Sequence, residues 1–231
     1  MSRLVAAGCV AAEEEADELL AAHPAAATLK AWVRRRQAGE PLAWITGSIE
    51  FCGHPVSVTP GVYVPRLQSQ ELAERAAGCL PTGGRAVELC AGAGAIAVHL
   101  MANDPSASVI AADISKASLM CARRNGVPCL LADLDAGLAS ASFDVVAAVA
   151  PYVPTDEIRF LPADVQRHEP RLALDGGADG LVLVRRIVAG AQRLLRPDGW
   201  LLLELGGDQD DLLAEDVRAA GFGPADSWFD E

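Results

Sequence analysis

The chain has 231 residues, of which 51% are hydrophobic, and a formal net charge of −12 at pH 7. A chain of this length and composition can bury a substantial core, so its fold needs neither a metal ion nor a disulfide for stability. The acidic balance disfavours a nucleic-acid partner, because phosphate groups are bound by basic surfaces. One basic run, Arg34–Arg36, departs from this balance, and a solvated helix end explains it better than a binding patch.

The first eighty residues predict a helical segment and then a β-hairpin. A break between the helices is expected at His23-Pro24, because proline lacks the amide donor and restricts the residue before it. Β-branched and aromatic residues then become frequent, with Gly53 and Gly61 at turn positions, which is typical of a hairpin. The predicted elements are helices over 2–22 and 25–38, a β-hairpin over 44–64, a helix over 69–78 and a loop over 81–84.

From residue 85 onward, short apolar runs alternate with helical patterns. Continuous apolar runs are typical of strands covered on both faces, as in a parallel sheet. The predicted strands are 86–90, 108–113, 128–132, 143–149 and 200–205, and the predicted helices are 95–102, 116–124, 180–195 and 209–220. Pro197-Asp198-Gly199 is expected to end the third of these helices. This alternation predicts an α/β fold with a doubly wound, mainly parallel sheet. We expect three regions: a short helical segment (1–40), a hairpin with a linking helix (41–80) and a Rossmann-like domain (81–231).

The six cysteines and the N-terminal residues indicate a cytoplasmic protein. No C-x-x-C pair occurs and no histidine cluster accompanies the cysteines, so the sequence predicts no metal site. Three glutamates, Glu13–Glu15, interrupt the first apolar residues, which argues against a signal peptide or a membrane span. We therefore expect reduced thiols, a cytoplasmic location and no membrane partner.

A glycine turn is the strongest sign of a ligand site. Gly92 and Gly94 lie directly after a predicted strand and before a predicted helix, where absent side chains let a ligand approach the backbone amides. Asp113 ends the next strand, where a carboxylate can accept hydrogen bonds from both hydroxyls of a ribose. The combination predicts a site for a nucleoside cofactor.

Two nucleoside cofactors fit this pattern. The run from Gly92 to Ala97 matches the dinucleotide fingerprint G-x-G-x-x-A, which keeps an NAD-dependent oxidoreductase as a minor alternative. Glu88 within the preceding strand favours S-adenosylmethionine, because a carboxylate attracts a cationic amino acid and repels a pyrophosphate. Asp133 closes the third strand, where it can accept from an adenine amine. The alternatives for these two acids are an edge-exposed charge at Glu88 and a loop cap at Asp133.

Several longer segments give the chain a family resemblance over roughly residues 39–207. They are Gly39–Ala43, Glu50–Gly53, Pro60–Val62, Pro65-Arg66, the glycine turn, Pro151–Pro154 and Glu169–Gly177. Together they resemble the HemK/PrmC-like methyltransferases, which methylate the side-chain amide of a glutamine in peptide release factors. The cysteines at positions 52 and 90 are most similar to a related actinobacterial branch of that family.

The resemblance implies a class I methyltransferase fold and S-adenosyl-L-methionine as the cofactor. It implies that Arg66, beside Pro65, closes over the cofactor from the side of the hairpin. The residues expected to bind the cofactor are Arg66, Glu88, Cys90, Gly92, Gly94, Asp113, Ile114, Asp133 and Leu134.

The main departure from the family lies after the fourth predicted strand. The family carries N-P-P-Y, and this chain carries Val149, Ala150, Pro151 and Tyr152. The resemblance implies that the asparagine holds the substrate amide towards the methyl group. Valine has no hydrogen-bonding group, and losing one positioned group costs a rate factor of about 10²–10³. The Ala150 carbonyl, Pro151 and Tyr152 are expected to line an acceptor pocket in catalytic positions.

Other departures lie at the ends and beside the hairpin. The family's R-P-E-T-E appears as Arg66–Gln70, without its two carboxylates. The region 1–40 is shorter than the family's usual release-factor-gripping domain. The sequence stops at Glu231, before the final strand expected of the fold, and truncation and divergence explain this equally.

Three functions follow from these departures. The favoured one is a methyltransferase whose acceptor is not a release-factor glutamine, a small molecule being one such acceptor. The second retains the protein-glutamine activity on a release factor, with the Ala150 carbonyl orienting the amide. The third binds S-adenosylmethionine without methylating, or uses its sulfonium for a different reaction. His54 and His168 are weak candidates for a base, because single loop histidines are more often solvated.

Overall fold

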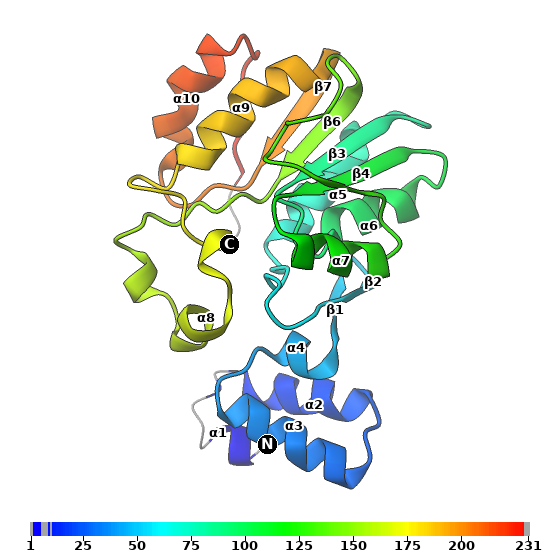
Figure 1. The fold of residues 1–231 in the computed structure, drawn as a ribbon, viewed down its shortest axis with the longest axis vertical. Coiled ribbons are helices and arrows are strands. Elements are labelled where there is room, and N and C mark those ends of the chain that lie inside the picture. The colour runs from blue at the N-terminus through cyan, green and yellow to red at the C-terminus, as the bar shows by residue number, and fades with distance from the viewer. Residues whose placement is uncertain (1, 6–8, 10, 229–231) are drawn as a thin grey trace.

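The computed structural model describes residues 2–5, 9 and 11–228, and its elements are drawn in Figure 1. The helices are α1 (Ser2–Val5), α2 (Ala12–Ala21), α3 (Ala26–Gln37), α4 (Leu42–Thr46), α5 (Ser69–Cys79), α6 (Ala95–Asn103), α7 (Lys116–Arg124), α8 (Ala163–His168), α9 (Val182–Leu194) and α10 (Gln209–Ala219), with 3₁₀ turns η1 (Ile158–Phe160) and η2 (Arg171–Ala173). The strands are β1 (Ser48–Phe51), β2 (His54–Ser57), β3 (Arg85–Leu89), β4 (Ser108–Asp113), β5 (Cys129–Leu131), β6 (Phe143–Ala148) and β7 (Leu195–Leu203). Among the described helices, none combines the length and the apolar character needed to cross a membrane.

The central sheet has the strand order β5-β4-β3-β6-β7, and every neighbouring pair in it is parallel. The chain builds outward from β3 to β5, then returns to place β6 on the other side of β3. The strand order therefore reverses between β3 and β6, and ligands of such sheets bind beyond the carboxyl ends of the strands at this point. The predicted doubly wound α/β fold is confirmed.

Alternate residues of each strand enter two different cores. Ala86 belongs to the core that contains the hairpin and α5–α7, whereas its neighbour Val87 belongs to the core beneath α9 and α10. Both faces of the sheet are therefore covered, which explains why its strands read as continuous apolar runs. In Figure 1, α9 and α10 lie on one side of the sheet and α5, α6 and α7 on the other.

The N-terminal helices pack around a core of their own, which includes Leu4, Leu19 and Ile45. They form a separate group at the bottom of Figure 1, where α4 leads into β1. Arg36 pairs with Glu15 on α2, and Arg35 pairs with Glu40. These two arginines of the basic run therefore serve contacts within this segment.

Several predicted boundaries differ from the structure. The helix expected over 2–22 appears as α1 and α2 within the described residues, and residues 6–8 and 10 lie outside them. The hairpin is shorter than 44–64: Trp44 lies in α4, where its indole nitrogen donates to the Val62 carbonyl. The strand expected from residue 200 pairs from Leu195 onward, because Pro197-Asp198-Gly199 forms an irregularity within β7 and not a loop before it.

Asn125, at the end of α7, connects the hairpin to the glycine turn. Its side-chain oxygen accepts from the Ser57 amide at 2.8 Å, and its side-chain nitrogen donates to the carbonyls of Ser57 and Ala93 at 3.0 and 2.9 Å. One side chain thus satisfies backbone groups from β2 and from the turn after β3. Such contacts hold the hairpin against the main sheet.

We expect Asn125→Ala to lower the free energy of unfolding by about 1–3 kcal/mol, because it leaves these partly buried backbone groups without partners. Urea denaturation followed by circular dichroism measures the change. Gln166→Ala, which removes hydrogen bonds from an exposed side chain, is the control and should change stability by less than about 0.5 kcal/mol. Equal effects of the two substitutions would contradict this role for Asn125.

Candidate functional site

Acidic side chains gather at the carboxyl edge of the sheet. Glu88 is the second-to-last residue of β3, and Asp113 is the last residue of β4. Asp133 follows β5, and Glu204 follows β7. Because the carboxyl ends of parallel strands meet at one edge, these four acids lie on the same side of the molecule. Strand β6 ends at Ala148 and is followed by the apolar residue Val149.

The glycine turn follows β3 directly. Cys90, Gly92 and Gly94 have φ angles of 53°, 54° and 76°. A Cβ atom at Gly94 would lie 3.1 Å from Ala122 Cβ, so this glycine lets the turn pack closely against α7. A Cβ atom at Gly92 would meet no atom within 4 Å, so the space beside this residue is open to a ligand. The two glycines therefore have different roles.

Glu88 is buried at the first turn of α6. It is 4% exposed, and its Oε2 accepts from the Ala97 amide at 2.8 Å. Burial raises the pKa of Glu88 to about 8, although the amides of Ala97 and Ile96 favour the charged form. Desolvation is the larger effect, so a cation bound beside Glu88 would stabilise its charged form.

Asp113 fixes the turn to the end of β4. Its two carboxylate oxygens accept from the amides of Gly92 and Ser115 at 2.8 and 2.7 Å. Burial raises the pKa of this carboxyl group, and the backbone hydrogen bonds oppose the shift. A carboxylate can accept about four hydrogen bonds, so Asp113 keeps acceptor capacity for ligand hydroxyls.

A cavity of about 320 Å³ lies over this turn. It contains Glu88, Cys90, Gly92, Asp113, Ile114, Asp133, Leu134, Val149 and Pro151 among its lining residues. Ile114 and Leu134 supply apolar surface, and Asp133 forms a half-exposed salt bridge with Arg186 at 2.9 Å. Seven of the nine predicted cofactor residues thus line one cavity; Gly94 packs behind it and Arg66 lies elsewhere.

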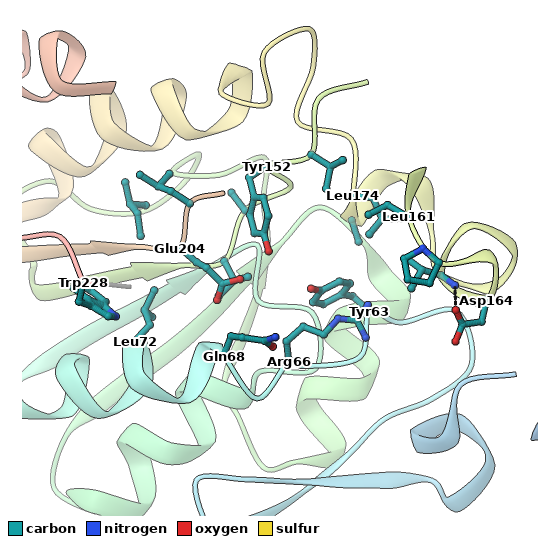
Figure 2. Close-up of a pocket in the computed structure, with 18 residues that line it drawn as sticks. Tyr63, Arg66, Gln68, Leu72, Tyr152, Leu161, Asp164, Leu174, Glu204 and Trp228 are labelled. Atoms are coloured by element: carbon teal, nitrogen blue, oxygen red, sulfur yellow. Dashed lines mark hydrogen bonds between the residues drawn. The ribbon is translucent and has the colours of Figure 1, made fainter. Parts of the chain in front are cut away.

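A second cavity, of about 600 Å³, lies beside the first. Its wall includes Val149, Ala150 and Tyr152, three of the four residues predicted to serve the acceptor. Figure 2 shows that the side chains of Tyr63 and Arg66, from the segment before α5, lie at this space together with Tyr152, which follows β6, and Glu204, which follows β7. Val149, Tyr63 and Ala173 line both cavities, so the two spaces adjoin at these residues.

Glu204 is a site residue that the sequence reasoning missed. Its Oε2 accepts from the Ser69 hydroxyl at 2.6 Å, and its carboxylate lies in the larger cavity. Burial, with Glu204 and Tyr63 nearby, raises the pKa of Tyr152 and keeps this phenol protonated. The sequence signal was available: an acid follows the apolar run of β7, as acids follow β4 and β5.

The structure places three other predicted residues away from the expected positions. Arg66 lines the larger cavity, where its guanidinium lies over the Tyr63 ring and pairs with the buried Glu169 at 2.6 Å. His54 begins β2 and faces His99, and His168 ends α8 and packs against Trp44. Neither histidine lines either cavity, so their candidacy as bases is not supported by their positions.

Curated proteins similar to this chain are methyltransferases. A release factor glutamine methyltransferase of Geobacter sulfurreducens is 36% identical over 202 residues, 85% of this chain and 71% of that protein. One of Moorella thermoacetica is 42% identical over 199 residues, 82% of this chain and 70% of that protein. A 4-amino-L-phenylalanine/4-methylamino-L-phenylalanine methyltransferase of Streptomyces pristinaespiralis is 36% identical over 234 residues, 95% of this chain and 80% of that protein.

A solved structure has the same fold. The ribosomal protein L11 methylase of Lactobacillus delbrueckii subsp. bulgaricus superposes with a TM-score of 0.50 at 15% identity, over 71% of this chain and 74% of that one. The expected class I methyltransferase fold is therefore confirmed. No protein-family model matches the chain.

We expect Gly94→Ala to lower the free energy of unfolding by about 2–5 kcal/mol. An alanine meets the strain of a positive φ, about 1–2 kcal/mol, and crowds Ala122 and Val127, about 1–3 kcal/mol. Gly221→Ala is the matched control, because its φ is +83° and its Cβ would meet no atom within 4 Å. Chemical denaturation should show the larger loss at Gly94; equal losses would contradict the crowding.

Proposed function

The chain belongs to the HemK/PrmC-like family of S-adenosylmethionine-dependent methyltransferases, and from this membership we propose that it methylates the amine of a small molecule. Its relatives show that the chain is a methyltransferase that uses S-adenosylmethionine. What we propose is the identity of the methyl acceptor. The observation that carries it is Val149, an apolar side chain at the place where the two cavities adjoin.

The smaller cavity fits the cofactor by the chemistry of its wall. Glu88 is a buried carboxyl group that lacks a cationic partner, which suits the amino group of the cofactor's methionine moiety. Asp113 keeps acceptor capacity for ribose hydroxyls, and Ile114 and Leu134 provide apolar surface for a flat base. When bound, the cofactor supplies an electrophilic methyl group on a sulfonium.

Val149 restricts the acceptors that this site can activate. An amide nitrogen is a weak nucleophile, because its lone pair is delocalised, and it needs hydrogen bonds to orient and polarise it. The side chain of Val149 offers neither a donor nor an acceptor. An amine has a localised lone pair and attacks without such help, so the altered position favours an amine over a glutamine amide.

Glu204 gives the larger cavity a group that recognises an amine. Ser69 holds one carboxylate oxygen of Glu204 at 2.6 Å, and the Tyr152 hydroxyl lies beside it in Figure 2. A carboxylate in this position accepts a hydrogen bond from an amine N–H and can receive its proton as the new C–N bond forms. In this proposal one oxygen of Glu204 accepts the hydrogen bond from Ser69, which positions the carboxylate, and the other oxygen contacts the acceptor.

The rest of the larger cavity favours an aromatic amine. Tyr63, Tyr152, Trp228 and Leu72 contribute aromatic and apolar surface, and about 600 Å³ is a typical volume for a small-molecule site. An aromatic amine is neutral at pH 7, and its nitrogen lone pair, although shared in part with the ring, is less delocalised than that of an amide. One relative, from Streptomyces pristinaespiralis, is named for methylation of an aromatic amine, and its match extends over 95% of this chain.

Methylation of a release-factor glutamine is the second candidate. The two relatives named for that activity support it, as does the position of Ala150 on the wall of the larger cavity. In this function the Ala150 carbonyl would accept a hydrogen bond from the substrate amide. It would have to act without the asparagine that the family resemblance implies.

Incubation with S-adenosylmethionine and either 4-amino-L-phenylalanine or a release factor bearing a G-G-Q loop tests the proposal. We expect a mass increase of one methyl group on the aromatic amine and none on the release factor. Glu204→Gln should lower kcat with the amine by about 10²-fold, because a general base of this kind contributes about 10²–10⁴. The dissociation constant for S-adenosylmethionine should stay unchanged.

Glu71→Gln, on the exposed surface of α5, is the matched control and should leave kcat unchanged. Methylation of the release factor by the native chain would overturn the preference for an amine. Methylation of the release factor by Val149→Asn alone would support the proposed reason for that preference.

The affinity for S-adenosylmethionine should depend on the ionisation of Glu88. A pKa of about 8 means that the carboxyl group is mostly protonated at pH 6–7, whereas a cationic ligand binds the carboxylate. Binding below pH 8 therefore displaces a proton, and this contribution to the affinity rises about tenfold for each pH unit up to 8. Calorimetry at several pH values measures it.

Glu88→Gln corrects for titration of the cofactor's own amino group. The ratio of the two dissociation constants, variant over native, should increase between pH 6 and pH 8 and then level off. A ratio that does not change with pH would show that Glu88 does not meet the cationic part of the cofactor.

A further inference from the structure

Three side chains with metal-binding atoms meet outside both cavities. Cys52 lies in the turn between β1 and β2, Glu74 lies on α5 and His99 lies on α6. Their sulfur, oxygen and nitrogen atoms all lie within 4.8 Å of one another. We call these three residues the hairpin cluster. None of them lines the cofactor or acceptor cavity, so neither binding proposal uses them.

We propose that the hairpin cluster binds a zinc ion that fastens the β-hairpin to α5 and α6. A thiolate, an imidazole and a carboxylate are all common zinc ligands, and a mixture of sulfur, nitrogen and oxygen donors suits zinc better than calcium or magnesium. Zinc–ligand bonds are about 2.0–2.3 Å, so donors around one tetrahedral ion lie about 3.5 Å apart. Side-chain adjustments of about 1 Å close the present arrangement to that spacing.

The surroundings of His99 support a ligand role over a packing role. Helix α6 is apolar apart from His99 and its last residue, Asn103, and His99 is 3% exposed. This buried imidazole nonetheless faces polar groups: Glu74 Oε2 at 3.4 Å and the amide nitrogen of Asn103.

We assign His54 as the fourth ligand, which it becomes only if its side chain moves, because the donor atoms that now lie within 4.8 Å of one another are those of Cys52, Glu74 and His99. It follows Cys52 by two residues across the hairpin turn, and its ring centroid lies 5.7 Å from that of His99. With His54 the cluster has the four protein ligands of a closed, structural zinc site. Cys52 has a φ angle of 48°, an uncommon conformation for a residue with a side chain, which the hairpin turn imposes at this position.

A zinc ion at this place would act on the cofactor cavity through Phe51. This residue precedes Cys52, is 1% exposed and lines the smaller cavity. An ion held by the hairpin turn and two helices would therefore fix one wall of the cofactor site.

The test uses the full chain, stripped with a chelator and then titrated with zinc. Elemental analysis should find one zinc per chain after removal of excess metal, and competition with a chromophoric chelator gives the dissociation constant. Zinc should raise Tm. Cys52→Ser should weaken zinc binding by at least about 100-fold, and Glu74→Gln by at least about 10-fold. These are lower bounds, because even residues that only hydrogen-bond to a metal ligand contribute about 10–100-fold to metal affinity.

Cys79→Ser is the matched control, because it removes a partly buried thiol from α5 outside the cluster, and it should leave zinc affinity unchanged. Glu74 is mostly exposed, so Glu74→Gln reports on binding even if a buried variant folds poorly. Less than about 0.1 zinc per chain, or equal losses in Cys52→Ser and Cys79→Ser, would overturn the proposal. Unchanged affinity in His54→Ala would overturn the assignment of the fourth ligand.

Discussion

The buried carboxyl group of Glu88 is the constraint on which the site depends. Glu88 is the second-to-last residue of β3, at the centre of the parallel sheet. Its carboxyl group accepts a hydrogen bond from an amide in the first turn of α6, beyond the glycine turn. The amides of α6 compensate only part of its desolvation, so its pKa stays raised. A cationic group beside Glu88 would stabilise its charged form, and the turn at Gly92 leaves open space for the cofactor that we propose to bind there.

The two cavities differ in their lining residues because they lie over the ends of different strands of the sheet. Glu88 in β3, Asp113 in β4 and Asp133 after β5 line the smaller cavity, which we propose for the cofactor, whereas Glu204 after β7 lines the larger cavity, which we propose for the acceptor. Val149 stands between the cavities and brings no hydrogen-bonding group, and Glu204 on the neighbouring strand brings a carboxylate.

The β-hairpin contacts both the glycine turn and the smaller cavity, so its attachment affects the geometry of the site. Asn125 ties it to the glycine turn, and Phe51 carries it into the wall of the cofactor cavity. The hairpin cluster of Cys52, Glu74 and His99 lies at its turn, between the hairpin and two helices. The hairpin and the cofactor site are thus mechanically connected, and a zinc ion at the cluster would strengthen that connection.

Local patterns in the sequence determined the α/β fold, the glycine turn and the acids Glu88, Asp113 and Asp133, because each depends on residues that are close together in the chain. The tertiary structure alone decided which residues share a cavity. It placed Arg66 beside Glu169 on the wall of the larger cavity, brought Glu204 to Ser69, and brought Cys52, Glu74 and His99 together. These contacts link elements far apart in sequence, and strand order and helix packing, which no local pattern encodes, bring them together.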